Sequence, residues 1–385
     1  NGRVVVRYVD LQEQPDAVKQ IDPNQAYQLR GGQVVVKSDQ RLRILTQDDF
    51  LQMTQDPLTG QATYNGFKAE ASLSGAIRFV TDDSVPHIYF TTGHGETSLT
   101  DGYVELRLLL NGHGYATVPL QTLTEEIPED AAALVMLSPR DDISPVEMKK
   151  FKDYIERGGS FFIAVDYHSG SYENLNQVLS LFDLFLTNER IEETREELIY
   201  REQPDQFLAQ VPISRIADKA YPNSVLTFNA RAVTTANQPA EWIGTEPLVT
   251  TDEQGTRKQD GEQIGDLGVQ NVAMVAENSG VVKSADMPSA KAVVLGSAAI
   301  LSDEVLRQLG ESGFNYRLIF YSFNWLTNRV TANTDLIIPV KPIIDYGISK
   351  LERVPITTAT VIAVVIIPLS LFVVARHVAK RRRHM

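Results

Sequence analysis

The chain has 385 residues, a formal net charge of −13 and no cysteine. This length is typical of two or three domains. The acidic balance argues against nucleic acid as a partner, and the lack of cysteine excludes disulfide bonds, zinc–thiolate sites and thiol catalysis.

Residues 1–85 predict a small α/β module. Residues 3–10 have the pattern of a strand, residues 15–21 that of a short helix, and residues 32–45 that of a hairpin. The order of strand, helix and hairpin resembles a thioredoxin-like arrangement. Because the chain has no CxxC motif, this thioredoxin-like module would have no thioredoxin chemistry.

Residues 86–190 alternate strands with helices, as expected for a mostly parallel sheet with right-handed crossovers. Ser144, Pro145 and Glu147 are the signature of a capped helix start. Strands are expected at 87–90, 117–120, 131–137 and 160–165, and helices at 103–111, 145–157 and 176–186.

The domain that begins at residue 86 is expected to extend to residue 335, with insertions around 190–290. Residues 192–197 are acidic and are expected to be solvated, and residues 252–266 have the composition of a mobile loop. Two later strands are expected at 272–276 and 291–297, and a closing helix at 315–328.

The C-terminal region predicts a membrane anchor. Residues 336–355 would be a linker, and residues 356–375 contain no charged residue. At ~1.5 Å per residue such a helix spans a hydrocarbon core of ~30 Å. The basic tail, residues 376–385, would then be cytoplasmic and the main domains would lie outside the cell membrane. The alternative is a buried core helix.

The turn after the strand at 87–90 is the strongest candidate for a functional site. It contains Thr92, Gly93, His94, Gly95 and Glu96. The two glycines permit positive φ angles or the close approach of another backbone. Parallel α/β sheets bind ligands at the carboxyl ends of their strands, which is where this turn is expected.

Asp166 and His168 follow the strand at 160–165 and would converge with His94 and Glu96 at the same edge. The four side chains could bind a polar ligand, or a metal through two imidazoles and two carboxylates. The alternative is that the glycines shape a turn whose side chains hydrogen-bond to loop backbone. Residues 140–142 could line the same crevice.

Several segments, read together, resemble the GldG-like family of ABC-transporter auxiliary proteins, named after gliding motility. They read GFKAEASLSGAIRFVTDD, IYFTTGHGE, LVMLSPRDDISPVEMKKFKDYIERGGSFFIAVD, VVLGSAAILSDE and FNWLTNR. The resemblance implies an extracytoplasmic protein that works beside an ABC permease and a cytoplasmic ATPase. Membrane lipid would be a further partner, and a homodimer within the complex remains open. No Walker A motif is present, so the chain is not the ATPase.

Residues 86–330 also resemble a class I glutamine-amidotransferase-like fold. The turn that holds the nucleophilic Cys in that fold holds Asp166, Tyr167 and His168 here, so amidotransferase activity is not expected. No G-x-S-x-G elbow is present either.

These observations predict a non-catalytic, membrane-anchored auxiliary subunit of an ABC transporter, without a cofactor. It would bind a substrate or partner and couple this to the permease. Two alternatives stay open. One is an anchored hydrolase acting on an envelope polymer, with Glu96 or Asp166 as acid or base, and the other is a structural scaffold.

Overall fold

The computed structural model describes eleven segments of the chain, which form two compact units, Asn1–Lys341 and Pro342–Met385. The described segments are residues 4–22, 29–39, 41–55, 62–82, 85–168, 170–217, 221–280, 289–309, 313–329, 341–343 and 362–382.

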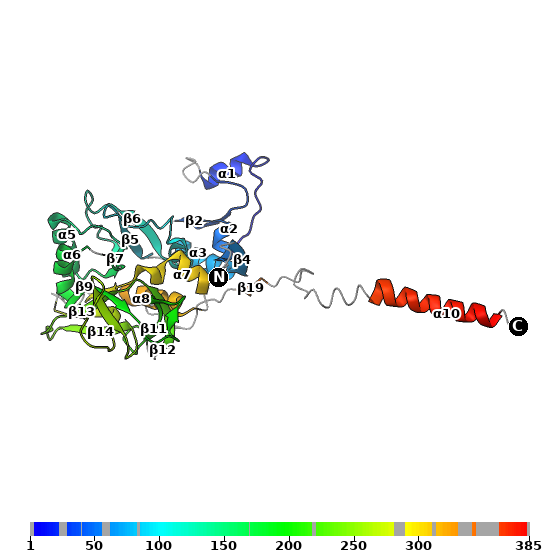
Figure 1. Cartoon of the computed structure of the whole chain (residues 1–385). Helices are drawn as coiled ribbons and strands as arrows, with labels where there is room; N and C mark the ends of the chain where they lie inside the picture. The colour runs from blue at the N-terminus through cyan, green and yellow to red at the C-terminus, as the bar shows by residue number, and fades with distance from the viewer. Residues whose placement is uncertain are drawn as a thin grey trace. The chain divides into compact units, whose positions relative to one another are not determined.

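The first unit is built around a 10-stranded mixed sheet, which confirms the α/β class (Figure 1). The strand order is β10-β11-β14-β17-β18-β8-β7-β5-β6, and β12 pairs with β11. Neighbours from β18 to β6 are parallel, whereas those from β18 to β10 are antiparallel. The strands are β5 (His87–Thr91), β6 (Ala116–Leu120), β7 (Ala131–Leu137), β8 (Phe161–Ala164), β10 (Ile199–Tyr200), β11 (Gln203–Val211), β12 (Tyr221–Phe228), β14 (Ile243–Thr250), β17 (Asn271–Asn278) and β18 (Ala290–Leu295).

Helices cover both faces of the parallel part of this sheet. On one face α5 and α6 pack against alternate side chains of β7 and β8. On the other face α4, α7 and α8 pack against the remaining ones. Since both faces are covered, the central strands β7 and β8 are apolar throughout, as is typical of parallel sheets. The helices are α4 (Val104–Gly112), α5 (Pro145–Glu156), α6 (Glu173–Leu179), α7 (Asp303–Leu309) and α8 (Phe314–Leu326), with 3₁₀ turns at Ser180–Phe182 and Ala298–Leu301.

A second, four-stranded sheet is present, and three predictions for residues 176–266 are wrong. Residues 252–266 contain the hairpin β15–β16, and Glu192 and Glu193 are buried rather than solvated. The helix expected at 176–186 ends early, because the chain turns at Asp183, which has a φ of 54°, and enters β9. The antiparallel order is β13-β9-β15-β16, formed by β9 (Leu184–Glu192), β13 (Arg231–Thr235), β15 (Thr256–Gln259) and β16 (Glu262–Ile264).

The N-terminal region does not form the predicted thioredoxin-like module. Residues 4–10 are not a strand: their side chains lack a covering layer, and Tyr8 is 94% exposed. The described strands of this region form two antiparallel pairs in different sheets, β1–β2 and β3–β4. The elements are α1 (Pro15–Ile21), β1 (Val34–Lys37), β2 (Leu42–Leu45), α2 (Gln47–Phe50), β3 (Leu51–Gln55), β4 (Ala62–Phe67) and α3 (Ala69–Thr81).

A buried ion-pair cluster joins this region to the large sheet domain. Glu105, at the start of α4, lies 3.3 Å from the ammonium of Lys68 and 3.2 Å from the guanidinium of Arg307. Its backbone N–H donates to Asp303 of α7. Because Glu105 and Lys68 are both buried, neither can exchange its partner for water, and the cluster fixes α4 against α3 and α7.

No helix in the described ranges is both long and apolar enough to cross a membrane. This finding overturns the predicted span over residues 356–375, and with it the membrane location and the cytoplasmic tail. The second unit contains a π-helical turn, Ile362–Ile366, followed by α10 (Ile367–Arg382). The last turns of α10 carry Arg376 and Lys380, which shortens its uncharged part. Residues 356–361 lie outside the described ranges, as does most of the linker; β19 (Lys341–Pro342) precedes them.

Phe323 of α8 provides a test of the packing between helix and sheet. Its ring is fully buried and stacks on Phe162 of β8, with 4.9 Å between ring centroids. Phe323→Ala should lower the free energy of unfolding by about 3–5 kcal/mol, because it leaves a cavity at this contact. Urea denaturation would measure the change. Val146→Ala, at an exposed position of α5, should change it by less than about 0.5 kcal/mol; equal effects would contradict the assigned core.

Candidate functional site

Three loops meet at the carboxyl edge of the parallel strands. The turn of residues 92–96 follows β5, residues 138–142 follow β7, and residues 166–172 follow β8. The first two loops are joined directly, since the carbonyl of His94 accepts the backbone N–H groups of Arg140 (2.7 Å) and Asp141 (3.1 Å). This edge is the place where the sequence pattern predicts a site.

His94 is buried between two carboxylates and is only 2% exposed. Its Nδ1 lies 2.8 Å from Oε1 of Glu96, and its Nε2 lies 3.0 Å from Oε1 of Glu147, on the first turn of α5. The second oxygen of Glu96 accepts the backbone N–H of His94 at 2.6 Å. Both ring nitrogens are therefore occupied, and neither is available to a ligand or a metal.

The charges of this group follow from its contacts. Burial alone would lower the pKa of His94, but the hydrogen bonds and negative charges of Glu96 and Glu147 outweigh it and raise that pKa to about 9. Burial alone would raise the pKa of Glu96 and that of Glu147, but hydrogen bonds lower both below the usual range. At neutral pH an imidazolium thus donates to two carboxylates.

Glu147 extends this contact to further segments. It is the third residue of α5, and the helix begins with a capping box in which Ser144 and Glu147 bond reciprocally. The hydroxyl of Thr122, from the loop after β6, also donates to Glu147 at 2.7 Å. The carboxylate lies at the positive end of the helix dipole, where negative charge is favoured. Glu147 therefore joins the turn after β5, the loop after β6 and the start of α5.

Asp166 belongs to a separate group. Its Oδ2 accepts the hydroxyl of Ser138 at 2.6 Å, and its Oδ1 accepts the backbone N–H groups of Ala298 and Ala299. Burial raises the pKa of Asp166 in spite of these hydrogen bonds. The carboxylate caps the 3₁₀ turn after β18 and so ties β7, β8 and β18 together at their ends.

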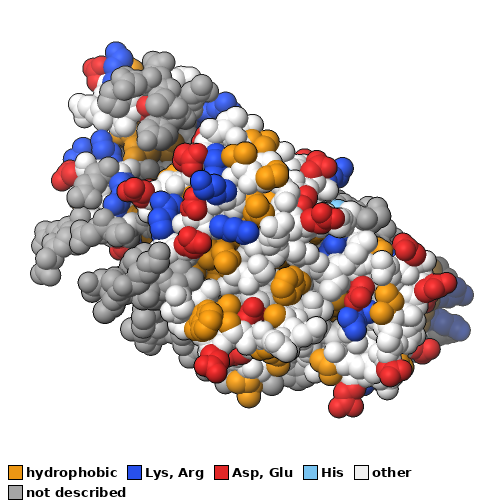
Figure 2. Space-filling view, turned by 90° about the vertical axis from the view of Figure 1, so that its left-hand side faces the viewer, with side chains coloured by type: hydrophobic (Ala, Val, Ile, Leu, Met, Phe, Trp, Pro, Cys, Tyr) orange, Lys and Arg blue, Asp and Glu red, His pale blue; other side chains and the backbone are white. Residues whose placement is uncertain are grey.

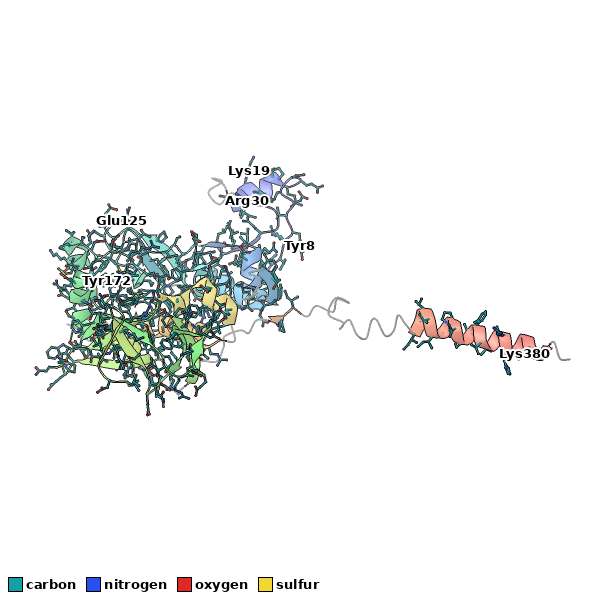
Figure 3. All side chains as sticks on the ribbon, in the orientation of Figure 1. Tyr8, Lys19, Arg30, Glu125, Tyr172 and Lys380 are labelled. Carbon is teal, nitrogen blue, oxygen red and sulfur yellow. The ribbon has the colours of Figure 1, made fainter. Side chains whose placement is uncertain are left out.

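His168 belongs to a third group. Its Nε2 bonds the hydroxyl of Tyr172, which donates to the carbonyl of Pro139. Burial, and then the charge of Arg231, lower the pKa of His168, so the ring is neutral at pH 7. Tyr172 lies within the protein body, whereas Glu125, in the loop after β6, lies at its surface (Figure 3).

Arg231, the first residue of β13, is only 1% exposed and has no carboxylate partner among the ion pairs of the described residues. Its guanidinium donates to the carbonyls of Thr187 (2.8 Å), His168 (3.0 Å) and Gly170 (3.3 Å). It also lies over the ring of Tyr172. This side chain fastens the four-stranded sheet to the loop after β8.

The seven predicted site residues lie on loops at the carboxyl edge, but the sequence does not reveal how they pair. In the part of the chain that the structure describes, no hydrogen bond or ion pair joins His94 or Glu96 to Asp166 or His168. Thr92, Gly93 and Gly95 are exposed at the surface of the turn. Glu147 was missed as a site residue, although its capping box was visible; its contact with His94 spans 53 positions and depends on the fold.

Residues 85–188 match a protein family described as an ABC-type uncharacterized transport system. The matched segment contains the turn with His94, the capped helix α5 and the strands β5 to β8. It thus covers the three loops of the carboxyl edge and associates them with an accessory role in transport. No match was found among curated proteins.

Similar solved structures include three proteins, each with a TM-score below 0.5. The mmIFT52 N-terminal domain has a TM-score of 0.46 and 16% identity, with 64% of this chain and 100% of that chain covered. A putative ThuA-like protein from Bacteroides uniformis has a TM-score of 0.37 and 13% identity, with 63% of this chain and 91% of that chain covered. The exo-β-1,4-mannosidase Op5Man5 from an Opitutaceae bacterium has a TM-score of 0.32 and 10% identity, with 69% of this chain and 39% of that chain covered.

The raised pKa of His94 predicts how stability depends on pH. A histidine with a folded-state pKa near 9 and an unfolded value near 6.5 contributes stability that is fully present below pH 6.5 and is lost as the pH rises through 9. A shift of this size corresponds to about 3 kcal/mol. The difference in unfolding free energy between the wild-type protein and His94→Gln, measured in urea, should therefore shrink between pH 6.5 and 9.

At low pH the contribution of this group to the unfolding free energy depends on pH in the opposite direction. The pKa values of Glu96 and Glu147 are lowered, so their contribution is present above about pH 4.5 and is lost as the pH falls below it. His87→Gln is a matched control, since His87 is partly exposed at the other end of β5. A difference between wild type and His94→Gln that does not change from pH 6 to 9 would contradict the charged assignment.

Proposed function

We propose that this chain is a non-catalytic accessory component of an ABC-type transport system and that its carboxyl edge contacts the permease or the ATPase. The family match over residues 85–188 supports the association with transport. The observation that carries the non-catalytic part is the double engagement of His94 by Glu96 and Glu147. An imidazolium fixed in this way serves to hold loops and has no free nitrogen for proton transfer.

The hydrolase alternative needs a carboxylate that can reach a substrate. Glu96 accepts hydrogen bonds from the side chain and backbone of His94 and from Thr91. Asp166 is half-buried and accepts one hydroxyl and two backbone N–H groups. Neither has the exposure or the free oxygen that a general acid or base requires. We therefore favour a binding role over hydrolysis.

The hydrolase alternative can be tested with the purified chain. With esterase, glycosidase and amidase substrates, Asp166→Asn should not lower the turnover below that of the wild-type chain, because Asp166 serves to cap a 3₁₀ turn. Circular dichroism and urea denaturation would establish that the variant is folded. Turnover by the wild-type chain that is lost in a folded Asp166→Asn protein would contradict the non-catalytic proposal.

The transport proposal predicts a stable association. The affinity-tagged chain, purified from its own cells in mild detergent, should carry an ABC permease and its ATPase, identified by mass spectrometry. His94→Gln should reduce their recovery, because it weakens the contact that holds the turn after β5 to Glu147. His87→Gln, at the opposite end of β5, should leave it unchanged. Purification of the wild-type chain without any ABC subunit would contradict the proposal.

A further inference from the structure

The imidazole of His168, in the loop after β8, uses both of its nitrogens to join two loops of the carboxyl edge. Its Nδ1 accepts the backbone N–H of Gly170 at 2.8 Å. Its Nε2 bonds the hydroxyl of Tyr172, and that hydroxyl donates to the carbonyl of Pro139 in the loop after β7. The ring therefore ties the loop after β8 to the loop after β7.

These contacts admit one tautomer of the neutral ring. A backbone N–H can only donate, so Nδ1 of His168 must offer a lone pair to Gly170, and the proton of the ring must be on Nε2. The hydroxyl of Tyr172 then accepts from Nε2 and uses its own proton on Pro139. A second proton, placed on Nδ1, would set two donors against each other and break the bond to Gly170.

The charged groups around His168 act in both directions. Burial, and then the guanidinium of Arg231, disfavour a positive ring and lower the pKa of His168. Asp166 and Asp141 favour a positive ring, but within the described ranges neither carboxylate forms a hydrogen bond or ion pair with it. Asp166 is instead bound by Ser138 and by two backbone N–H groups after β18. The neutral ring is therefore the form that this environment stabilises.

Arg231 lies close to the ring and cannot move away from it. Its guanidinium lies 5.0 Å from the centroid of the Tyr172 ring, and the rings of His168 and Tyr172 meet edge-on with 5.2 Å between their centroids. Arg231 is 1% exposed and donates to the carbonyl of His168 at 3.0 Å. Burial raises the pKa of Tyr172, so its hydroxyl keeps its proton and offers no negative charge. A positive imidazole in this position would be repelled by a fixed positive neighbour.

The ring can reach solvent, whereas Arg231 cannot. His168 is partly exposed, so its side chain can turn outward while the carbonyls of His168 and Gly170 stay bound to Arg231. Figure 2 shows acidic and basic side chains interspersed on one face of the molecule, which gives that face no broad potential of one sign. The response of the ring to pH is therefore decided by the neighbouring groups named above.

We propose that His168 is an acid-sensitive latch of the carboxyl edge: when Nδ1 takes up a proton from solvent, the ring leaves Gly170 and Tyr172, and the tie between the loops after β8 and β7 is lost. In the open form the ring is solvated and titrates near pH 6.5, as histidine usually does. The closed form binds the proton less readily, so it is favoured above pH 6.5 and loses this advantage as the pH falls below that value. The latch goes beyond the transport role and does not depend on it.

Hydrogen exchange at the amide of Gly170, followed by NMR on the complete chain, measures the latch directly. After correction for the intrinsic exchange rate at each pH, the protection factor should fall severalfold between pH 7.5 and 5.5. The upper limit is about tenfold, set by one proton taken up near pH 6.5. The amides of β8 are the internal control and should keep their protection. A change of less than about twofold at Gly170, or an equal fall in β8, would overturn the proposal.

Two variants assign the response to one ring. His168→Gln removes the titrating group and keeps an acceptor for the N–H of Gly170, so protection there should no longer depend on pH. His113→Gln is the matched control, because burial also lowers the pKa of His113, but its ring bonds the carbonyl of Leu109 in α4; the wild-type fall at Gly170 should remain. A fall that persists in His168→Gln would refute the latch and leave the transport role standing.

The tautomer gives a test that needs no variant. The ¹⁵N chemical shifts of the His168 ring in the wild-type chain should show an unprotonated Nδ1 and a protonated Nε2 at pH 7.5, because Gly170 donates to Nδ1. A proton on Nδ1 at this pH would refute the latch, even if His168→Gln does not fold.

Discussion

The imidazolium of His94, buried between Glu96 and Glu147, is the interaction on which the carboxyl edge depends. A single carboxylate at either position would be costly to bury, because the interior does not solvate a charge as water does. Each of the three charged groups offsets the free-energy cost of burying the other two. Since Glu147 also binds Thr122 and Ser144, loss of one partner would affect two loops and the start of α5 together.

The sheet brings these groups into range of one another. Parallel pairing of β5, β7 and β8 places all three of their carboxyl ends at one edge, where loop side chains far apart in sequence can meet. Helices on both faces exclude water from the strands and leave the edge as the accessible part. The edge then divides into separate groups around His94, Asp166 and His168, each with its own hydrogen-bond partners.

The sequence was informative where one local rule decides the structure. The unbroken apolar run of β7 predicts a strand buried on both faces, and the capping box at Ser144 predicts the first residue of α5. The prediction failed where tertiary contacts decide. Residues 252–266 are polar and glycine-rich, yet they form a hairpin because β15 pairs with β9. The uncharged run at 356–375 suggested a membrane span from composition alone. The pairing of His94 with Glu147 joins two segments that no local pattern connects.

The buried guanidinium of Arg231 has a consequence for motion. Its bonds run from β13 of the four-stranded sheet to carbonyl groups of β9 and of the loop after β8. If that loop moved away from β13, the guanidinium would lose its acceptors in a place that water does not reach, at a cost of several kcal/mol. We therefore expect the loop after β8 and the four-stranded sheet to move together rather than independently.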